Sequence, residues 1–331
     1  GGASAQDPPV VISNLRIVKG TSVYTSNFTP PNSPLTNITN TKLLCCQSST
    51  SATAATVTPN SITANGGCTP KSVNPFDAFT VDGVSYQSAS AAGLSAGSID
   101  ITAASVNKEA GFSIITFNGN GSAGSTISHG LGRKPKFIIV KRRTGGNQAW
   151  FIRLGSFNSD YNGRYVRLQD NGGASGTDTN VFPNTEPTST VISLGADAGV
   201  NASGSTYLCY CWAEIPGFSK FHLFKGNGSN EGPYVHLGFR PRMFIFKRLG
   251  GNSGWNNVDT SRAPTNPNNK RIEVNTSGVQ DSSSDYHIDI LNDGIKVRNS
   301  NSEWNASERY AIMAWAEQPG TNPYGTETNS R

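Results

Sequence analysis

Residues 111–122, GFSIITFNGNGS, return as GFSKFHLFKGNGS at residues 217–229. Two further blocks recur in the same order: LGRKPKFIIVKRRTGGNQAW, ending at Trp150, returns as LGFRPRMFIFKRLGGNSGW, ending at Trp255, and NASGSTYLCYCWAE, ending at Glu214, returns as NASERYAIMAWAE, ending at Glu317. Self-similarity in three separated blocks at one spacing is the signature of a structural repeat. The sequence therefore predicts two tandem units of about 104 residues, over 111–216 and 217–318.

The pattern inside both units is that of β-strands. KFIIVKRR and MFIFKRL are short β-branched or aromatic runs, and TYLCYCWAE and RYAIMAWAE alternate bulky and small side chains with a period of two. HIDILNDGIKVR places Asn292, Asp293 and Gly294 between two alternating runs, which predicts a hairpin whose glycine accepts a positive φ. No stretch has the helical apolar spacing over three turns. We therefore expect an all-β chain in which each unit is an antiparallel sandwich or barrel.

Gly119, Gly121 and Gly124 match the G-x-G-x-x-G spacing of a dinucleotide-binding loop. Such a loop needs a helix directly after the glycines and an acidic residue about 20 positions later. Here the glycines are followed by STISHGLGRKP and then by KRRTGG, and in the second unit the third glycine moves to Gly232. The glycines are therefore interpreted as turn residues between two strands, and no nucleotide cofactor is expected.

Catalytic patterns are weak. GLSAG at residues 93–97 matches the nucleophile elbow of serine hydrolases, but its surroundings lack the required β/α pattern. Glu214 and Glu317 are the best-placed carboxylates for a glycosidase, yet their equivalence in the two units indicates a structural task, such as accepting hydrogen bonds from backbone amides at a strand end. The spacing of the aspartates fits no EF-hand loop. We expect no enzyme, no catalytic residue, no cofactor and no metal site.

Composition narrows the partners. Charged residues are 15% of the chain, against about 25% in an average domain. The formal net charge is +5, which permits an anionic partner without requiring one. No RNP motif or aromatic-basic interleaving favours nucleic acid. The sequence contains no run of 18 apolar residues and no visible signal peptide. It therefore predicts neither a membrane span nor a signal for export.

Basic and aromatic residues supply a hypothetical contact site for a glycan or another anion. Its members are Trp150, Trp255, Arg142, Arg143, Lys247 and Arg248. Two structural alternatives stand beside it. The basic residues can form a solvated sheet edge that resists association between strands. The two tryptophans are equivalent in the repeat, which favours a role in the core or in sheet packing.

The N-terminal third of the sequence differs from the repeats in composition and pattern. Residues 1–50 contain two strand-like runs, ISNLRIVKG and TKLLCCQS, joined by the proline-rich FTPPNSPL. Two or three strands are too few to bury a sandwich face, so this segment needs support from elsewhere. Residues 51–110 are interpreted as a linker that holds a hairpin-like FTVDGVSY and an alanine-rich turn, and residues 319–331 as a C-terminal tail.

ISNLRIVKG, Tyr24, NFTPP, PLT and TKLLCCQS resemble the closing strands of LamG-like, concanavalin-type jelly rolls in marine phage structural proteins. FTVDGVSYQSASAAGL and the two paired units resemble the uncharacterised C-terminal domain that follows such jelly rolls in tail-fibre-like proteins of cyanophages and related phages. The resemblance covers residues 11–318 and includes only the end of the jelly roll. It implies a virion component and transfers no functional residue.

The expected function is that of a non-enzymatic phage virion structural protein, made in the host cytoplasm and placed on the tail or capsid surface. A tail fibre, an appendage and a head decoration all fit. The expected partners are other virion proteins, a host lipopolysaccharide or glycan, and two further copies in a homotrimer. A secreted bacterial carbohydrate-binding adhesin is the alternative, and a polysaccharide depolymerase is a third possibility.

Overall fold

The computed structural model describes residues 12–28, 34–48, 50–65, 68–70, 78–146 and 148–317. The predicted tail over 319–331 lies outside them. The chain divides into two compact units, an N-terminal unit over residues 1–92 and a C-terminal unit over residues 93–331.

The N-terminal unit holds one small sheet and one hairpin. Strands β1 (Leu15–Val18), β2 (Thr41–Cys45) and β3 (Ala55–Val57) pair antiparallel in that order. The predicted hairpin in FTVDGVSY is confirmed as β4 (Phe79–Val81) and β5 (Val84–Tyr86). Its two loop residues, Asp82 and Gly83, have φ values of 50° and 80°. Both lie in the left-handed region that tight hairpin turns require.

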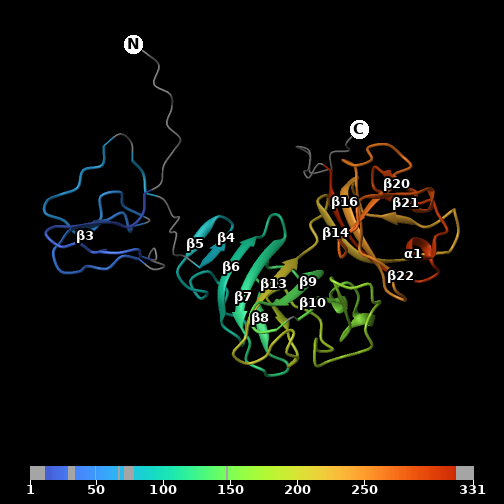
Figure 1. Ribbon diagram of the computed structural model, residues 1–331, viewed down its shortest axis with the longest axis horizontal. Helices are drawn as coiled ribbons and strands as arrows, with labels where there is room; N and C mark the ends of the chain where they lie inside the picture. The colour runs from blue at the N-terminus through green and yellow to red at the C-terminus, as the bar shows by residue number, and fades with distance from the viewer. Residues whose placement is uncertain are drawn as a thin grey trace, which may run out of the picture. The chain divides into compact units, whose positions relative to one another are not determined.

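The first repeat, in the C-terminal unit, begins with two long paired strands (Figure 1). Its strands are β6 (Ile101–Asn107), β7 (Phe112–Asn118), β8 (Thr126–Ser128), β9 (Phe137–Arg142), β10 (Trp150–Arg153), β11 (Tyr165–Arg167), β12 (Val191–Ser193) and β13 (Thr206–Trp212), with 3-10 turns η1 (Leu154–Ser156) and η2 (Ser159–Tyr161). The large sheet runs in the order β11–β10–β9–β13–β7–β6, and β12 pairs with β8 in a small sheet.

The second repeat has the same plan. Its elements are β14 (Ser219–Lys225), β15 (Tyr234–His236), β16 (Pro241–Arg248), β17 (Asn256–Asp259), β18 (Lys270–Glu273), β19 (Asp281–Ser282), η3 (Ser284–Tyr286), β20 (Ile288–Leu291), β21 (Gly294–Val297), α1 (Ser302–Asn305) and β22 (Arg309–Ala316). The large sheet runs β14–β22–β16–β17–β18–β19, and the small sheet runs β15–β21–β20. The all-β prediction is confirmed, and strand order is duplicated along with sequence.

Strand β6 corrects the proposed linker boundary at residue 110. It pairs antiparallel along β7, from Asn107 opposite Phe112 to Ile101 opposite Phe117. Ile101, Ala104 and Val106 are buried because they extend the core of the first repeat. The pairing shifts register between Ile101 and Ala103, so the period-two pattern of a half-buried strand holds only from Ala104 to Asn107. No described strand of the second repeat occupies the corresponding place, so β14 is an edge strand.

Each large sheet has two apolar faces. In the second repeat the inner face packs on the small sheet, where Phe244, Phe246 and Ile312 meet Ile290 and Ile295 in one core. Side chains of the outer faces of both large sheets form another core, which joins Phe137 and Ile139 of the first repeat to Phe221 and Met313 of the second. Successive strand residues point to opposite faces, so alternate residues of β9 and β22 serve different cores.

The glycine loop after β7 is held by a buried asparagine. Asn201 is fully buried, its Nδ2 donates to the carbonyl oxygens of Ser122 and Gly195, and its backbone oxygen accepts from Gly121 N at 2.7 Å. Gly119 allows close approach, because a Cβ there would lie 2.3 Å from the Ala202 oxygen.

Asn305 repeats this arrangement after β14. It is fully buried, its Nδ2 donates to the oxygens of Ser229 and Asn299, and its backbone oxygen accepts from Gly228 N at 2.6 Å. A Cβ at Gly226 would lie 2.1 Å from the Ala306 oxygen. The duplicated glycines therefore serve loop packing, as the turn interpretation predicts.

The hairpin predicted around Asn292, Asp293 and Gly294 is confirmed, but its physical reason is different. Leu291 pairs with Gly294 across the two-residue loop between β20 and β21. Gly294 does not have a positive φ. Glycine is needed there because a Cβ would lie 2.2 Å from the Val235 oxygen of β15.

The two repeat-equivalent glutamates differ in what they hold. Glu214 Oε1 accepts a hydrogen bond of 2.9 Å from the Phe221 amide on the edge of β14, as the strand-end interpretation predicts. For Glu317 that interpretation is wrong. Its carboxylate accepts from the guanidinium groups of Arg240, at 2.7 Å, and Arg242, at 3.3 Å.

Candidate functional site

Lys247 and Trp255, proposed as glycan contacts, are buried, with exposed fractions of 0% and 1%. The Lys247 ammonium donates to the backbone oxygens of Asn171, at 2.8 Å, and Ser253. The Trp255 indole donates to the Arg167 oxygen at 3.1 Å. Asn171 and Arg167 belong to the first repeat, so both side chains join the repeats. Their burial excludes them from a surface glycan site and corrects that hypothesis.

Lys141 and Trp150 form the equivalent pair in the first repeat. The Lys141 ammonium donates to the Gln148 oxygen and lies 5.4 Å from the centre of the Trp150 ring. Trp150 is half-buried and packs against the core shared by the two repeats. A lysine that closes the following turn and packs over the tryptophan is therefore a duplicated structural device.

The three proposed arginines are dispersed among different contacts. Arg142 Nη2 donates to Ser205 Oγ at 2.7 Å. Arg248 binds the Glu308 carboxylate through two hydrogen bonds, of 2.8 and 3.0 Å. Arg143 is exposed. The six residues nominated from the sequence thus do not form one site.

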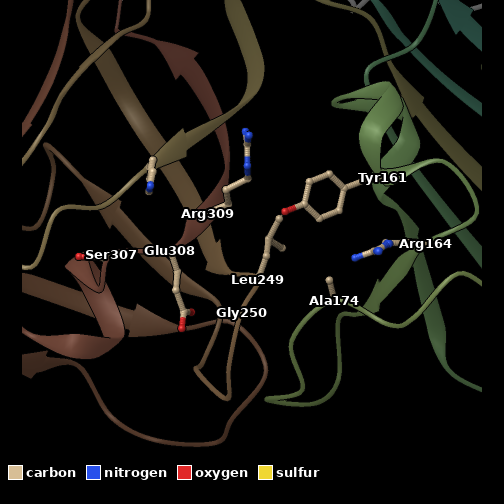
Figure 2. A pocket seen from close by; sticks show the side chains of 9 residues that line it. Tyr161, Arg164, Ala174, Leu249, Gly250, Ser307, Glu308 and Arg309 are labelled. Atoms are coloured by element: carbon tan, nitrogen blue, oxygen red, sulfur yellow. The ribbon is translucent and has the colours of Figure 1, made fainter.

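A different set of residues lines a cleft of about 490 Å³ between the repeats. Its lining residues are Tyr161, Arg164 and Ala174 of the first repeat and Lys225, Leu249, Gly250, Ser307, Glu308 and Arg309 of the second. Figure 2 shows Tyr161 and Arg164 on one side of this space and Arg309 on the other. The Ala174 amide donates to the Leu249 oxygen at 2.8 Å, which ties the repeats together at the cleft.

Local turns position the first-repeat side of the cleft. Asn158 caps η2, since its Oδ1 accepts from the Asp160 amide at 2.8 Å, and Tyr161 ends that turn. The Arg164 amide then donates to the Tyr161 oxygen at 3.0 Å. The Arg164 guanidinium lies 5.6 Å from the centre of the Tyr161 ring, within cation–π range.

Two cations on neighbouring strands form the other side. Lys225 ends β14 and lies directly opposite Arg309, which begins β22. The neighbouring Gly226 amide bonds the Glu308 oxygen, so Lys225 and Arg309 are a non-hydrogen-bonded pair, whose side chains are closest in an antiparallel ladder. Both are exposed. Like charges directly opposite each other destabilise a sheet, so this pair costs stability unless an anion lies between them.

No carboxylate within the described part of the chain forms an ion pair with Arg164, Lys225 or Arg309. The one acidic lining residue, Glu308, is held by Arg248, and its side chain points away from Arg309 in Figure 2. Hydrogen bonding to Arg248 lowers the pKa of Glu308, and the same hydrogen bond raises the pKa of Arg248. The cleft can therefore bind an anion by charge, with the Tyr161 hydroxyl as a further hydrogen-bonding group.

Sequence reasoning missed this cleft because its cations are isolated in the chain. A signal was present in the repeat. Lys225 and Arg309 stand where the first repeat pairs Asn118 with Thr206, so two neutral residues become two cations at one cross-strand position. Comparing the repeats position by position, after pairing their strands, reveals the change.

Among the described residues, no group of three or more His, Cys, Asp and Glu side chains could hold a metal ion. A search of the same residues for a helix long and apolar enough to cross a bilayer finds none.

No curated protein and no solved structure matches the chain. The model of one protein family, described as a domain of unknown function, DUF7483, matches residues 33–319. This match includes both repeats and the strands β2 and β3 that precede them, which is most of the sequence. The chain therefore belongs to the DUF7483 family.

Proposed function

We propose that this protein is a non-enzymatic structural protein of a phage virion that attaches to an anionic host-surface glycan through the cleft between its repeats. A tail fibre or appendage suits this task best, because attachment happens at the exposed ends of a virion. The resemblance to cyanophage fibre-like proteins supports the virion setting, and the charge of the cleft supports the ligand class.

The observation that carries the proposal is the cross-strand pair of Lys225 and Arg309, with Arg164 on the facing side. Three cations around one cleft attract phosphate, sulfate or carboxylate groups, and an open cleft leaves these groups accessible on a long polymer. The Tyr161 ring and hydroxyl suit a sugar, since aromatic side chains pack on sugar faces while the hydroxyl bonds a polar substituent.

Attachment gains strength from repetition. A single exposed ion pair contributes about 0–1 kcal/mol, so one cleft alone binds weakly. We propose that the protein acts as a homotrimer, in which three clefts on one particle convert modest affinity into firm adhesion. Size-exclusion chromatography with light scattering at micromolar concentration tests this assembly, and a monomer as the sole species would contradict it.

The test of the proposed ligand is binding to immobilised host lipopolysaccharide or capsule. Lys225→Asn and Arg309→Thr restore the neutral residues of the first repeat, so the strand pair keeps a natural combination. Each change is expected to weaken binding by up to about fivefold, or about 1 kcal/mol, as expected for one exposed ion pair. Added salt should also weaken binding by the wild-type protein, because it screens the charges of the cleft.

Arg133→Thr is the matched control, because it removes an exposed charge that does not line the cleft. It should leave binding unchanged. Equal losses in all three variants would indicate attraction by overall charge alone, and no loss in any of them would reject the cleft as the site.

The adhesin alternative shares this ligand and differs in location, which mass spectrometry of purified virions decides. The depolymerase alternative predicts new reducing ends after incubation with the polysaccharide. An intact polymer that is bound but not cleaved is the outcome that our proposal requires.

A further inference from the structure

In the first repeat, residues 94–107 close one side of the sandwich. Strand β6 pairs along the free edge of β7, and the segment before it runs along β8. The Ile99 amide donates to the Thr126 oxygen at 2.9 Å, and the Ala96 amide donates to Ser128 Oγ at 3.0 Å. The apolar side chains Leu94, Ile99, Ile101 and Val106 are all buried there. One extended segment thus covers the edges of both sheets.

Among the residues that the structure describes, the second repeat has no such segment at the equivalent edges, β14 and β15. The Gly226 amide bonds to β22, so the alternation of the strand directs the amides of Leu223 and Lys225 away from the sheet. In β15 the Leu237 amide bonds the Asp293 oxygen, which directs the amides of Tyr234 and His236 outward. None of these four amides has a hydrogen-bond partner among the residues that the structure describes. Unpaired amides in a row are the template for adding a strand.

Part of the β14 edge is already occupied, and this sets the limits of the open side. The Glu214 carboxylate accepts from the Phe221 amide and pairs with Lys220 at 3.5 Å. The open part therefore begins at Leu223.

The side chain that precedes Leu223 in β14 also differs between the two repeats. His222 lies opposite Ile312 in the way that Ile115 lies opposite Cys209 in the first repeat. Ile115 is fully buried, whereas His222 is half-buried and its Nδ1 has no partner within the described part of the chain. A buried polar atom without a partner is costly, and a donor from an added segment would satisfy it.

We propose that the open side formed by Leu223, Lys225, Tyr234 and His236 binds an extended segment of a partner protein. The segment has the chemistry of residues 94–107, with apolar side chains at alternate positions as at Ile99 and Ile101. Its backbone pairs with β14 as β6 pairs with β7, and one of its amides donates to the Tyr234 oxygen of β15 as the Ile99 amide donates to the Thr126 oxygen of β8. Main-chain pairing supplies affinity, and the alternate side chains supply specificity. The proposal uses the backbone amide of Lys225, whereas the glycan cleft uses its side chain, so the two surfaces adjoin at this residue. The open side gives the protein a place to be joined to another component.

Amide hydrogen exchange of the full chain tests the proposal, with the synthetic peptide LSAGSIDITAASVN, residues 94–107, as the probe. At a peptide concentration of about ten times Kd, exchange at the four outward amides should slow by roughly tenfold. The amides of His222 and Phe224, which already pair with β22, should not change. No protection of the four amides at about 1 mM peptide, or protection only at another edge, would overturn the proposal.

Two matched changes sharpen the test. Leu223→Pro removes one outward amide, which an edge strand tolerates, and should abolish the protection at Lys225, whereas Leu223→Val keeps the amide and should preserve it. A peptide N-methylated at Ile99 loses the donor that meets Thr126 in the first repeat, and should bind at least about tenfold more weakly. The peptide change leaves the protein intact, so it decides the matter even where the proline variant does not fold.

Discussion

The two repeats share their buried hydrogen bonds and differ where they meet solvent. Asn201 and Asn305 hold the same glycine loop, and Phe117 stacks on Tyr207 as Phe224 stacks on Tyr310, at 5.1 and 5.0 Å between ring centres. At the edges, β6 covers the first sheet, whereas the second sheet ends at β14 and carries a pair of cations there. The comparison shows that the buried scaffold is the same in both repeats and that the strand edges differ.

The largest effect is expected from substitutions in the glycine loops, which the two repeats share. Gly119→Ala and Gly226→Ala each place a Cβ within 2.3 Å of a backbone oxygen that cannot move independently. We expect each to lower the free energy of unfolding by about 2–3 kcal/mol, with similar losses in both repeats. Chemical denaturation measures the change.

Gly176→Ala is the control for this prediction, because its Cβ would meet no atom within 4 Å and its φ is not positive. Its effect should stay within about 0.5 kcal/mol. If the variants of Gly119 and Gly226 were as stable as this control, the close approach would have no energetic role.

The next effect concerns the joint between the repeats. Burial lowers the pKa of Lys247 from 10.5 to about 8, although Asp170, Glu303 and Glu273 favour its charged form. Between about pH 8 and 10.5 the unfolded chain therefore binds more protons at this lysine than the folded chain does, so stability rises with pH in this window. We expect a gain of about 1–2 kcal/mol, measured by denaturation at several pH values.

Lys247→Met should remove this rise, because the titrating group is gone while the length of the side chain is kept. The neutral amine of the wild-type protein still donates to Asn171 and Ser253, so the joint remains intact above pH 8. A rise of equal size in the methionine variant would assign the effect to other groups.

The smallest effect is expected at the cleft, where the two repeats differ in the partner of one arginine. Arg248 binds the Glu308 carboxylate, whereas the equivalent Arg142 donates to the Ser205 hydroxyl and the Ala198 oxygen. Glu308→Ser should lower stability by about 0.5–1 kcal/mol at neutral pH, since the pair is partly exposed. Hydrogen bonding to Arg248 lowers the pKa of Glu308, so the pair stabilises the fold above the ordinary pKa of this carboxyl, and its contribution is lost as pH falls through the lowered value.

Ser205→Glu is the reciprocal change and should give Arg142 a carboxylate partner. Urea denaturation of both variants at neutral and acidic pH measures the contribution of the pair. A loss in Glu308→Ser that persists at acidic pH would show that packing, and not charge, stabilises this contact.

Local patterns predicted much of the fold. The repeat, the period-two strands and both hairpins depend on neighbours in sequence, and all are present. The reason assigned to Gly294 was wrong because its constraint comes from Val235, on a strand remote in the chain. Strand β6 was assigned to the linker because its small residues, Ala103, Ala104 and Ser105, make its alternation weak.

The site could not be predicted in the same way. Lys225 and Arg309 become neighbours only through pairing of β14 with β22, and Arg164 joins them only when the repeats pack together. Trp255 alternates outward from its sheet, which in a single sandwich would mean solvent. Here the large sheet of the first repeat covers that outward face and makes it a core, so the exposure of Trp255 could not be judged from one repeat alone.

The core shared by the outer faces of the two large sheets makes each repeat depend on the other. Cutting the chain between the repeats would expose Phe137 on one piece and Phe221 on the other, and large exposed apolar patches promote aggregation. A gene fragment that encodes one repeat alone would therefore yield a protein that is prone to aggregate. The pair is the smallest block that can be shuffled intact into a new protein.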